Sequence, residues 1–347
     1  MSDRALRPGR AFAATAAVLV GLVIALLLAE GLVRVFFDEP VQPRFVIDPG
    51  YGVRANKPNV ETRHYVPGDY EVGITTNSAG MRGQREYPEA RVPGKRRVLL
   101  LGDSFVFGYG VEDQDVVSAV LEDLLNAGDA TGGGYEVINL SVSGFGQAEE
   151  LVTWEKRARN YDPDVVVMFY FENDVGNNAS SELYKVAADG TLTRTGNSFL
   201  PGTNLQDSLL SIGPTRWLFE HSQAWNLIRN RLSSLVQKSL IRKQGLKSYD
   251  DLTPEAVALT RALLVQMIAD IRRDGAEPVF VLIPEKRHMS VTSFPLSLAE
   301  AQELGARVVD GREYLSAEDY YVRDSHWRPV GHRKTAERLA ALIRATP

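Results

Sequence analysis

The chain has 347 residues, of which 44% are hydrophobic and 24% charged, and its formal net charge is −5. This composition is typical of a globular protein with one large domain and additional segments, and the acidic balance argues against nucleic acid as a partner. The sequence contains no cysteine, which excludes a disulfide framework, thiolate metal ligands and a thiol nucleophile.

An uncharged apolar run opens the chain. Residues 11–29 carry no charge, and Glu30 is the only charged residue in 11–33. At about 1.5 Å per residue such a helix crosses a hydrocarbon core of roughly 30 Å. The run is preceded by Arg4, Arg7 and Arg10. By the positive-inside rule, we predict that residues 1–36 form a cytoplasmic tip and a single-pass anchor in the inner (cytoplasmic) membrane, with the remainder periplasmic. A signal peptide cleaved near Ala29 is the alternative.

The next segment, residues 37–94, is rich in Pro, Gly, Arg and Asn. Short alternating stretches such as 70–75 interrupt this composition. Alternation of this kind is typical of half-buried strands. We therefore expect an extended, strand-bearing connector between the bilayer and the following domain.

Strands and helices alternate along residues 95–347. Strands are predicted at 98–102, 135–140, 165–171, 278–284 and near 307–309, and helices at 116–125, 147–158, 254–273 and 329–345. This order predicts an α/β domain with a parallel sheet covered by helices. No internal repeat of 20–50 residues is present.

A helical insertion interrupts the alternation at about 177–250. Its second half, 217–243, interleaves large apolar residues with Arg and Lys. A basic amphipathic stretch can lie on an anionic membrane surface or cap a substrate groove. A helical hairpin packed on its own domain is the alternative.

Four short motifs carry side chains able to do chemistry. They are Gly102-Asp103-Ser104, Ser143-Gly144-Phe145-Gly146, Glu172-Asn173-Asp174 and Asp324-Ser325-His326-Trp327. The first three follow predicted strands of one parallel sheet and therefore emerge at the same edge. The fourth precedes the last helix, where a loop can fold over that edge.

Each of these residue types has a role in acyl transfer. A serine hydroxyl such as Ser104 needs an adjacent base, for which the imidazole of His326 is suited, and Asp324 would accept the other ring N–H. The backbone N–H groups of Ser104 and Gly144 and the side-chain amide of Asn173 would donate to the oxyanion. Individually, these residues are also ordinary turn and cap residues. His332, within the predicted last helix, is an alternative base.

At these residues the chain resembles the SGNH (GDSL-type) hydrolase family, named for Ser, Gly, Asn and His in four blocks. The resemblance covers about residues 96–345. It implies a flavodoxin-like three-layer α/β/α domain, no cofactor, and hydrolysis or transfer of acyl esters, with Ser104 as nucleophile, Gly144 and Asn173 in the oxyanion hole and His326 as base. Phe171 occupies a place where the family usually has glycine. A single residue separates Asp324 from His326, which is similar to the Asp-x-His-Trp arrangement of bacterial polysaccharide O-acetyltransferases.

The resulting hypothesis is a serine esterase or acylhydrolase acting on acyl, above all O-acetyl, esters of cell-envelope glycans or lipids. The alternatives are an O-acetyltransferase of an envelope polysaccharide and a non-catalytic envelope protein that binds through the same fold. A metal-dependent phosphoesterase could draw ligands from Asp103, Asp174, Asp324 and His326. The sequence has no second nearby histidine and no Asp-x-Asp pair at these motifs, so we expect no metal site.

Overall fold

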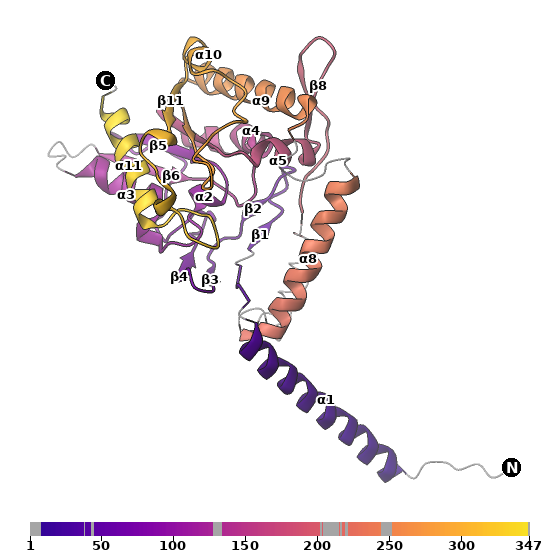
Figure 1. Ribbon diagram of the computed structural model, residues 1–347. Coiled ribbons are helices and arrows are strands. Elements are labelled where there is room, and N and C mark those ends of the chain that lie inside the picture. The colour runs from indigo at the N-terminus through magenta and orange to yellow at the C-terminus, as the bar shows by residue number, and fades with distance from the viewer. Residues whose placement is uncertain are drawn as a thin grey trace.

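A five-stranded parallel sheet is the centre of the computed structural model, which describes residues 8–37, 39–42, 45–127, 134–201, 203, 215, 217–218, 221–243 and 252–345 (Figure 1). Its strands are β5 (Arg96–Leu101), β6 (Tyr135–Asn139), β7 (Val165–Tyr170), β10 (Glu277–Leu282) and β11 (Arg307–Asp310). They lie in the order β11-β10-β7-β5-β6. Counted along the chain, this order is 2-1-3-4-5, the flavodoxin-like doubly wound arrangement. The predicted α/β fold is therefore confirmed.

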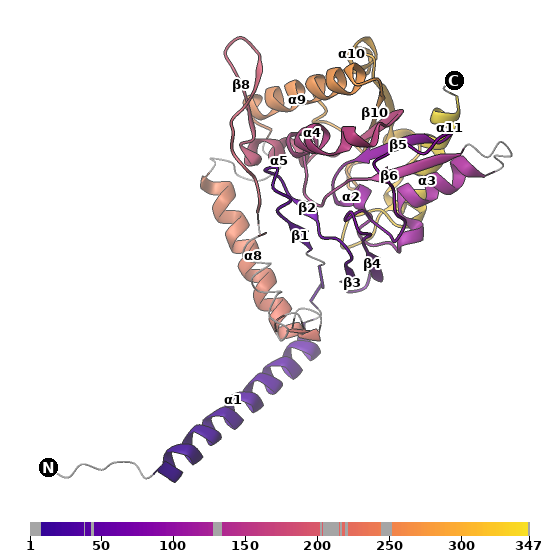
Figure 2. The ribbon, with the colours of Figure 1, turned by 180° about the vertical axis from the view of Figure 1, so that it is seen from behind.

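Helices cover both faces of the sheet because its strands are apolar on both sides (Figures 1 and 2). Val98 and Leu100 of β5 pack in the cluster that includes α3 (Val117–Asn126) and α11 (Pro329–Arg344). The alternate residues Leu99 and Leu101 pack in a second cluster on the opposite face. This second cluster includes residues of α4 (Gln147–Lys156) and α9 (Pro254–Arg273). The remaining short helices are α2 (Ser104–Phe107), η1 (Asp113–Asp115), η2 (Ala158–Tyr161), α5 (Asp174–Ser181), α10 (Leu298–Glu303), η3 (Gly311–Glu313) and η4 (Ala317–Asp319).

The first helix, α1 (Pro8–Phe36), projects away from the sheet domain (Figure 1). Its stretch Phe12–Phe36 is long and apolar enough to cross a membrane, and none of it is buried inside the structure. By length and composition it is a candidate membrane anchor or signal sequence. The membrane orientation expected from the flanking arginines remains a prediction.

The segment between α1 and the sheet contains four short strands. β1 (Val46–Ile47) pairs with β2 (Ala55–Asn56), and β3 (Glu61–Val66) pairs with β4 (Tyr70–Thr75), both antiparallel. Val53 and Met81 are fully buried and belong to the same core cluster as the sheet. This segment is therefore folded against the domain that follows it, although the predicted boundary near residue 94 stays a prediction.

The insertion expected at 177–250 holds a small antiparallel hairpin and a long helix. The hairpin pairs β8 (Tyr184–Val186) with β9 (Leu192–Arg194). The helix is α8 (Gln223–Lys243), and it lies beside the end of α1 (Figures 1 and 2). Residues 202, 204–214, 216, 219–220 and 244–250 of the predicted insertion lie outside the described residues.

Candidate active site

Ser104 is presented at the point where the strand order reverses. β5 lies between β6 and β7 in the sheet, and the chain turns from β5 directly into α2, of which Ser104 is the first residue. Asp103 caps this helix, since its carboxylate accepts the N–H of Phe105 at 2.9 Å. Gly102 is required here because a Cβ would lie 2.4 Å from Cγ2 of Val106. In doubly wound folds, this edge is where ligands bind.

His326 contacts the serine through one ring nitrogen and an aspartate through the other. Its Nε2 lies 2.8 Å from Ser104 Oγ, and its Nδ1 lies 3.0 Å from Oδ2 of Asp324. The second contact has the distance of an ion pair and places the Asp324 carboxylate against the ring nitrogen that does not face the serine. The side chains of His326 and Asp324 are only 18% and 15% exposed. The structure therefore brings together the three residues that the sequence predicts as nucleophile, base and acid.

The backbone of Ser325 allows the short Asp-x-His spacing. Its φ is +61°, in the left-handed region that few residues other than glycine adopt. The loop is closed around it by an antiparallel bridge between Tyr320 and Trp327 and by the N–H of Tyr321, which donates to the carbonyl of His326 at 2.8 Å. With this left-handed conformation at Ser325, the side chains of Asp324 and His326, two positions apart in the sequence, lie in contact.

The charges at the site favour a basic imidazole. Burial lowers the pKa of His326, but the hydrogen bond and charge of Asp324 and the charge of Asp103 outweigh burial and raise it above its usual value. Burial likewise raises the pKa of Asp324, and its contacts with His326 and Tyr70 outweigh this and lower it. Asp324 is thus held as an anion beside an imidazole that can accept a proton.

Gly144 lies in the predicted loop after β6 and has the left-handed φ of +75° that favours glycine. Its carbonyl accepts a hydrogen bond from Nη2 of Arg54 at 3.3 Å, which ties this loop to the N-terminal segment. Asn173 immediately precedes α5, and its side chain hydrogen-bonds to Asp103. The oxyanion-hole roles of Gly144 and Asn173 remain predictions.

Four carboxyl groups are buried behind the serine turn: Asp103, Glu149, Glu150 and Asp174. Asp174 holds local structure, because its Oδ2 accepts from Nε2 of Gln147 at 2.6 Å and from the N–H of Phe171 at 3.1 Å. Burial, followed by the charge of Asp103, raises the pKa of Asp174 well above its usual value. Within the described ranges, no group of three or more His, Cys, Asp or Glu side chains is arranged to hold a metal ion.

His332, the alternative base, is bound elsewhere. Its Nδ1 accepts the backbone N–H of Val117, the first residue of α3, at 3.2 Å. Burial, with the charges of Arg82 and His326, lowers its pKa to about 3, so the ring is neutral. This contact joins α11 to α3 and gives His332 a structural role.

Phe171 belongs to an aromatic cluster around the serine turn. Its ring centroid lies 4.9 Å from that of Phe105, which in turn lies 4.9 Å from the ring of His326. The ring centroid of Tyr109 lies 5.5 Å from that of His326. The imidazole of His326 therefore contacts two aromatic rings, those of Phe105 and Tyr109.

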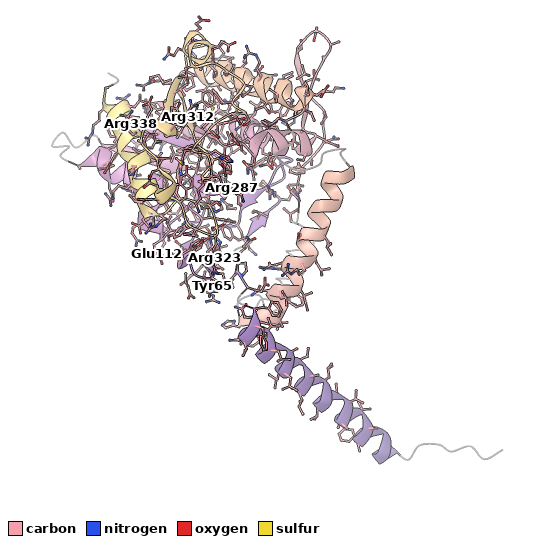
Figure 3. The ribbon with its side chains drawn as sticks, viewed as in Figure 1. Tyr65, Glu112, Arg287, Arg312, Arg323 and Arg338 are labelled. Carbon is pink, nitrogen blue, oxygen red and sulfur yellow. The ribbon has the colours of Figure 1, made fainter. Side chains whose placement is uncertain are left out.

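The β3–β4 hairpin contributes to the site in a way that the sequence did not predict. The hydroxyl of Tyr70 donates to Oδ2 of Asp324, and Oδ2 of Asp69 accepts the N–H of Asp324 at 2.8 Å. Arg323 of the loop, labelled with Tyr65 of β3 in Figure 3, donates through its guanidinium to the carbonyl of Pro67 at 2.8 Å. Alternation in 70–75 indicated a strand, but nothing in the sequence pattern links it to residues about 250 positions later.

Comparisons with known proteins yield structural likenesses only. No family model matches the sequence, and no curated protein matches it. Among solved structures, the chain is similar to TesA (15% identity, TM-score 0.43, covering 72% of this chain and 99% of that one). It is also similar to a lipase/acylhydrolase from Enterococcus faecalis (18%, 0.38, 72% and 96%) and to the acetylxylan esterase Axe2 from Geobacillus stearothermophilus (14%, 0.40, 73% and 94%). At this level of likeness, function must be judged from this chain's own residues.

Proposed function

We propose that this protein is a serine esterase that cleaves acyl esters with Ser104 as nucleophile, His326 as general base and Asp324 as its orienting acid. The observation that carries the proposal is the continuous contact from Ser104 Oγ to His326 Nε2 at 2.8 Å and from His326 Nδ1 to Asp324 Oδ2 at 3.0 Å. A hydroxyl, an imidazole and a carboxylate in this order are the parts that nucleophilic ester cleavage needs.

The reaction follows from this arrangement. Ser104 Oγ attacks the ester carbonyl carbon while its proton passes to Nε2 of His326, and the carbonyl oxygen becomes an oxyanion. Collapse of the intermediate breaks the carbon–oxygen bond, and the leaving alcohol takes the proton from Nε2. Water then attacks the acyl-serine, giving a proton to His326, and the carboxylic acid leaves as the proton returns to Ser104. Asp324 keeps its proton-free form and stabilises the imidazolium in both halves.

The oxyanion requires fixed donors at the serine turn. The proposed donors are the backbone N–H groups of Ser104 and Gly144 and the side-chain amide of Asn173. Ser104 begins a helix, so its N–H has no partner within that helix. The positive φ of Gly144 supports its assignment, since backbone without a Cβ can approach substrate closely.

The proposed substrate is an acyl ester, above all an O-acetyl ester, of a cell-envelope glycan or lipid. This rests on α1, which we propose spans the inner membrane with its N-terminus inside because three arginines precede its apolar stretch Phe12–Phe36. The domain would then lie in the periplasm, where glycans and lipids carry acyl groups.

The test uses the full chain purified in detergent. We expect it to hydrolyse an aryl acetate without sensitivity to chelators and to react with a fluorophosphonate, which mass spectrometry locates on Ser104. Labelling of Ser104 without hydrolysis would favour transfer to an acceptor, as in an O-acetyltransferase. Absence of a Ser104 adduct would overturn the proposal, in favour of a binding protein if the chain is inactive or of a metal enzyme if chelators stop turnover.

A further inference from the structure

We infer that Tyr70 is a positioning residue for the Asp324–His326 pair, an inference that rests on the proposed function. The Tyr70 hydroxyl donates to Oδ2 of Asp324, the same oxygen that lies 3.0 Å from Nδ1 of His326. Oδ2 of Asp324 therefore accepts the Tyr70 hydroxyl and also contacts the imidazole of His326. A second donor on this oxygen fixes the carboxylate rotamer and shares its negative charge.

The turn between β3 and β4 holds the backbone of the same loop. Oδ2 of Asp69 accepts the N–H groups of Arg323 and Asp324 at 2.7 and 2.8 Å. The guanidinium of Arg323 donates a hydrogen bond to the carbonyl of Pro67, just before this turn, at 2.8 Å. Two neighbouring residues of the β3–β4 hairpin thus hold Asp324: Asp69 binds its main chain and Tyr70 binds its side chain. The hairpin is therefore part of the site.

His64 extends the hydrogen-bond chain on the far side of Tyr70. The Nε2 of this buried histidine lies 3.1 Å from the Tyr70 hydroxyl. Burial outweighs the charge of Asp324 and lowers the pKa of His64 to about 3, so the ring is neutral and can donate one N–H. Burial, with the charge of Asp324, raises the pKa of Tyr70, so its hydroxyl stays protonated. His64 therefore donates its N–H to the Tyr70 oxygen, and the Tyr70 hydroxyl donates its proton to Asp324, so each donated hydrogen has an acceptor.

The charged and titratable groups around His326 fix the sign of the expected effect. Asp324 and Asp103 act on it with negative charge, and His64 acts on Asp324 from the hairpin. The positive charge of Arg82 acts on His64, and Tyr109, from the segment after α2, contacts the ring of His326. Without the Tyr70 hydroxyl, the Asp324 carboxylate no longer shares its negative charge with a second donor. It therefore stabilises protonated His326 more strongly, and the pKa of His326 rises. Below that pKa the ring is protonated and cannot accept a proton from serine, so activity is lost at a higher pH.

The central test is Tyr70→Phe in the full chain in detergent, assayed with an aryl acetate. We expect kcat to fall about tenfold, a fraction of what a positioned base supplies, with KM within about twofold. We also expect the acidic limb of kcat/KM against pH to move upward by about half a unit. A variant with wild-type kcat and an unmoved limb would overturn the inference. So would a lower kcat with an unmoved limb, because that indicates a structural role alone.

Two further sets of variants keep the test sharp. Tyr87→Phe removes another tyrosine–carboxylate hydrogen bond, from Tyr87 to Glu122 at 2.9 Å, and should leave kcat and the pH profile unchanged. Asp69→Ala should lower kcat as Tyr70→Phe does, whereas Asp69→Asn keeps an acceptor oxygen and should restore most of it. Equal activity of the two Asp69 variants would contradict the role of the hairpin turn.

A readout without turnover separates this inference from the proposed function. The chain has only five histidines, so ring-labelled histidine gives few NMR signals, and His326→Asn identifies one of them. The pKa of His326 should be higher in Tyr70→Phe than in the wild type. If the wild type is inactive as an esterase but this shift is seen, the proposed function fails and the assignment of Tyr70 stands. An unshifted His326 in an active enzyme overturns the assignment alone.

A second and independent observation concerns the contact between α1 and α8. Glu30, the only charged residue in 11–33, binds the start of α8: its carboxylate accepts from Gln223 N at 2.9 Å, Ala224 N at 3.1 Å and Ser222 Oγ at 2.7 Å. Arg34 pairs with Glu30 at 2.7 Å. A carboxylate at a helix N-terminus is favourable, so α8 begins at the end of the candidate membrane helix.

One face of α8 is apolar and exposed. Ile228, Leu232 and Leu235, spaced as neighbours along one side of the helix, are 57%, 57% and 63% exposed. The sequence of α8 contains five basic residues and no acidic one. We propose that this face lies in the headgroup layer of the bilayer that α1 spans, where apolar side chains and anionic lipid together bind such a helix. Figure 1 shows α8 directed away from the axis of α1 at their junction.

The absence of native cysteine makes this proposal directly testable. An environment-sensitive NBD dye on Leu232→Cys should emit at shorter wavelength, and resist an aqueous quencher, in nanodiscs containing phosphatidylglycerol. The same dye on Glu303→Cys, in exposed α10 across the domain from α1, should report water (Figure 1). Equal emission at both positions would overturn the proposal. Shielding of residue 232 that increases with protein concentration would also overturn it, because a second copy would then cover the face.

Discussion

Replacing Ser104 with alanine is expected to lower kcat for an aryl acetate by about 10⁴-fold or more, because it removes the only atom that the proposed mechanism lets form the acyl-enzyme. The fold should persist. Asp103, and not Ser104, caps α2, so the alanine variant keeps the hydrogen bond to Phe105 that starts the helix. The measurement is initial-rate kinetics of the full chain, with circular dichroism of both proteins and loss of fluorophosphonate labelling.

A serine elsewhere supplies the matched control. Ser297 caps α10 and accepts the N–H of Glu300 at 3.1 Å. Ser297→Ala should cost about 1 kcal/mol of stability and leave kcat unchanged. If Ser104→Ala retains a tenth or more of wild-type kcat, the nucleophile lies elsewhere, and the contact between Ser104 and His326 would not report on catalysis.

The sheet could be predicted from sequence because its strands are buried on both faces. A continuous apolar run at 165–171 corresponds to β7, where every residue is buried, and the run at 98–102 overlaps β5. Ser104 was found for the same reason, since it follows immediately where such a run stops. These predictions depend only on residues that are neighbours in the sequence, so they can be made without knowledge of the fold.

Contacts across the chain could not be predicted in this way. Tyr70 and Asp69 reach Asp324 across more than 250 residues, and only the folded hairpin places them there. Arg54 reaches the carbonyl of Gly144 across 90 residues. Hydrogen bonds of this kind depend on turn geometry and register, which a single sequence with irregular composition at 37–94 does not specify.

The left-handed backbone of Ser325 was also invisible, because serine does not favour positive φ as glycine or asparagine does. The sequence showed only that Asp324 and His326 stand closer than in the family it resembles. The structure pairs this short spacing with a φ of +61° at the intervening residue, and the two side chains meet at 3.0 Å. A conformation that costs roughly 1 kcal/mol is retained where the acid and the base meet.

Ser325→Pro should lower kcat by about 10³-fold or more. Proline fixes φ near −65° and cannot adopt the positive φ that residue 325 has in this loop. Ser325→Gly adopts positive φ freely, so it should keep kcat within about threefold and raise the melting temperature slightly. Steady-state kinetics and thermal unfolding of both variants test this. The proline variant should still bind the aryl acetate with a similar KM, since Ser104 and its aromatic neighbours come from other segments. A proline variant that turns over normally would show that Asp324 and His326 cooperate without this backbone reversal.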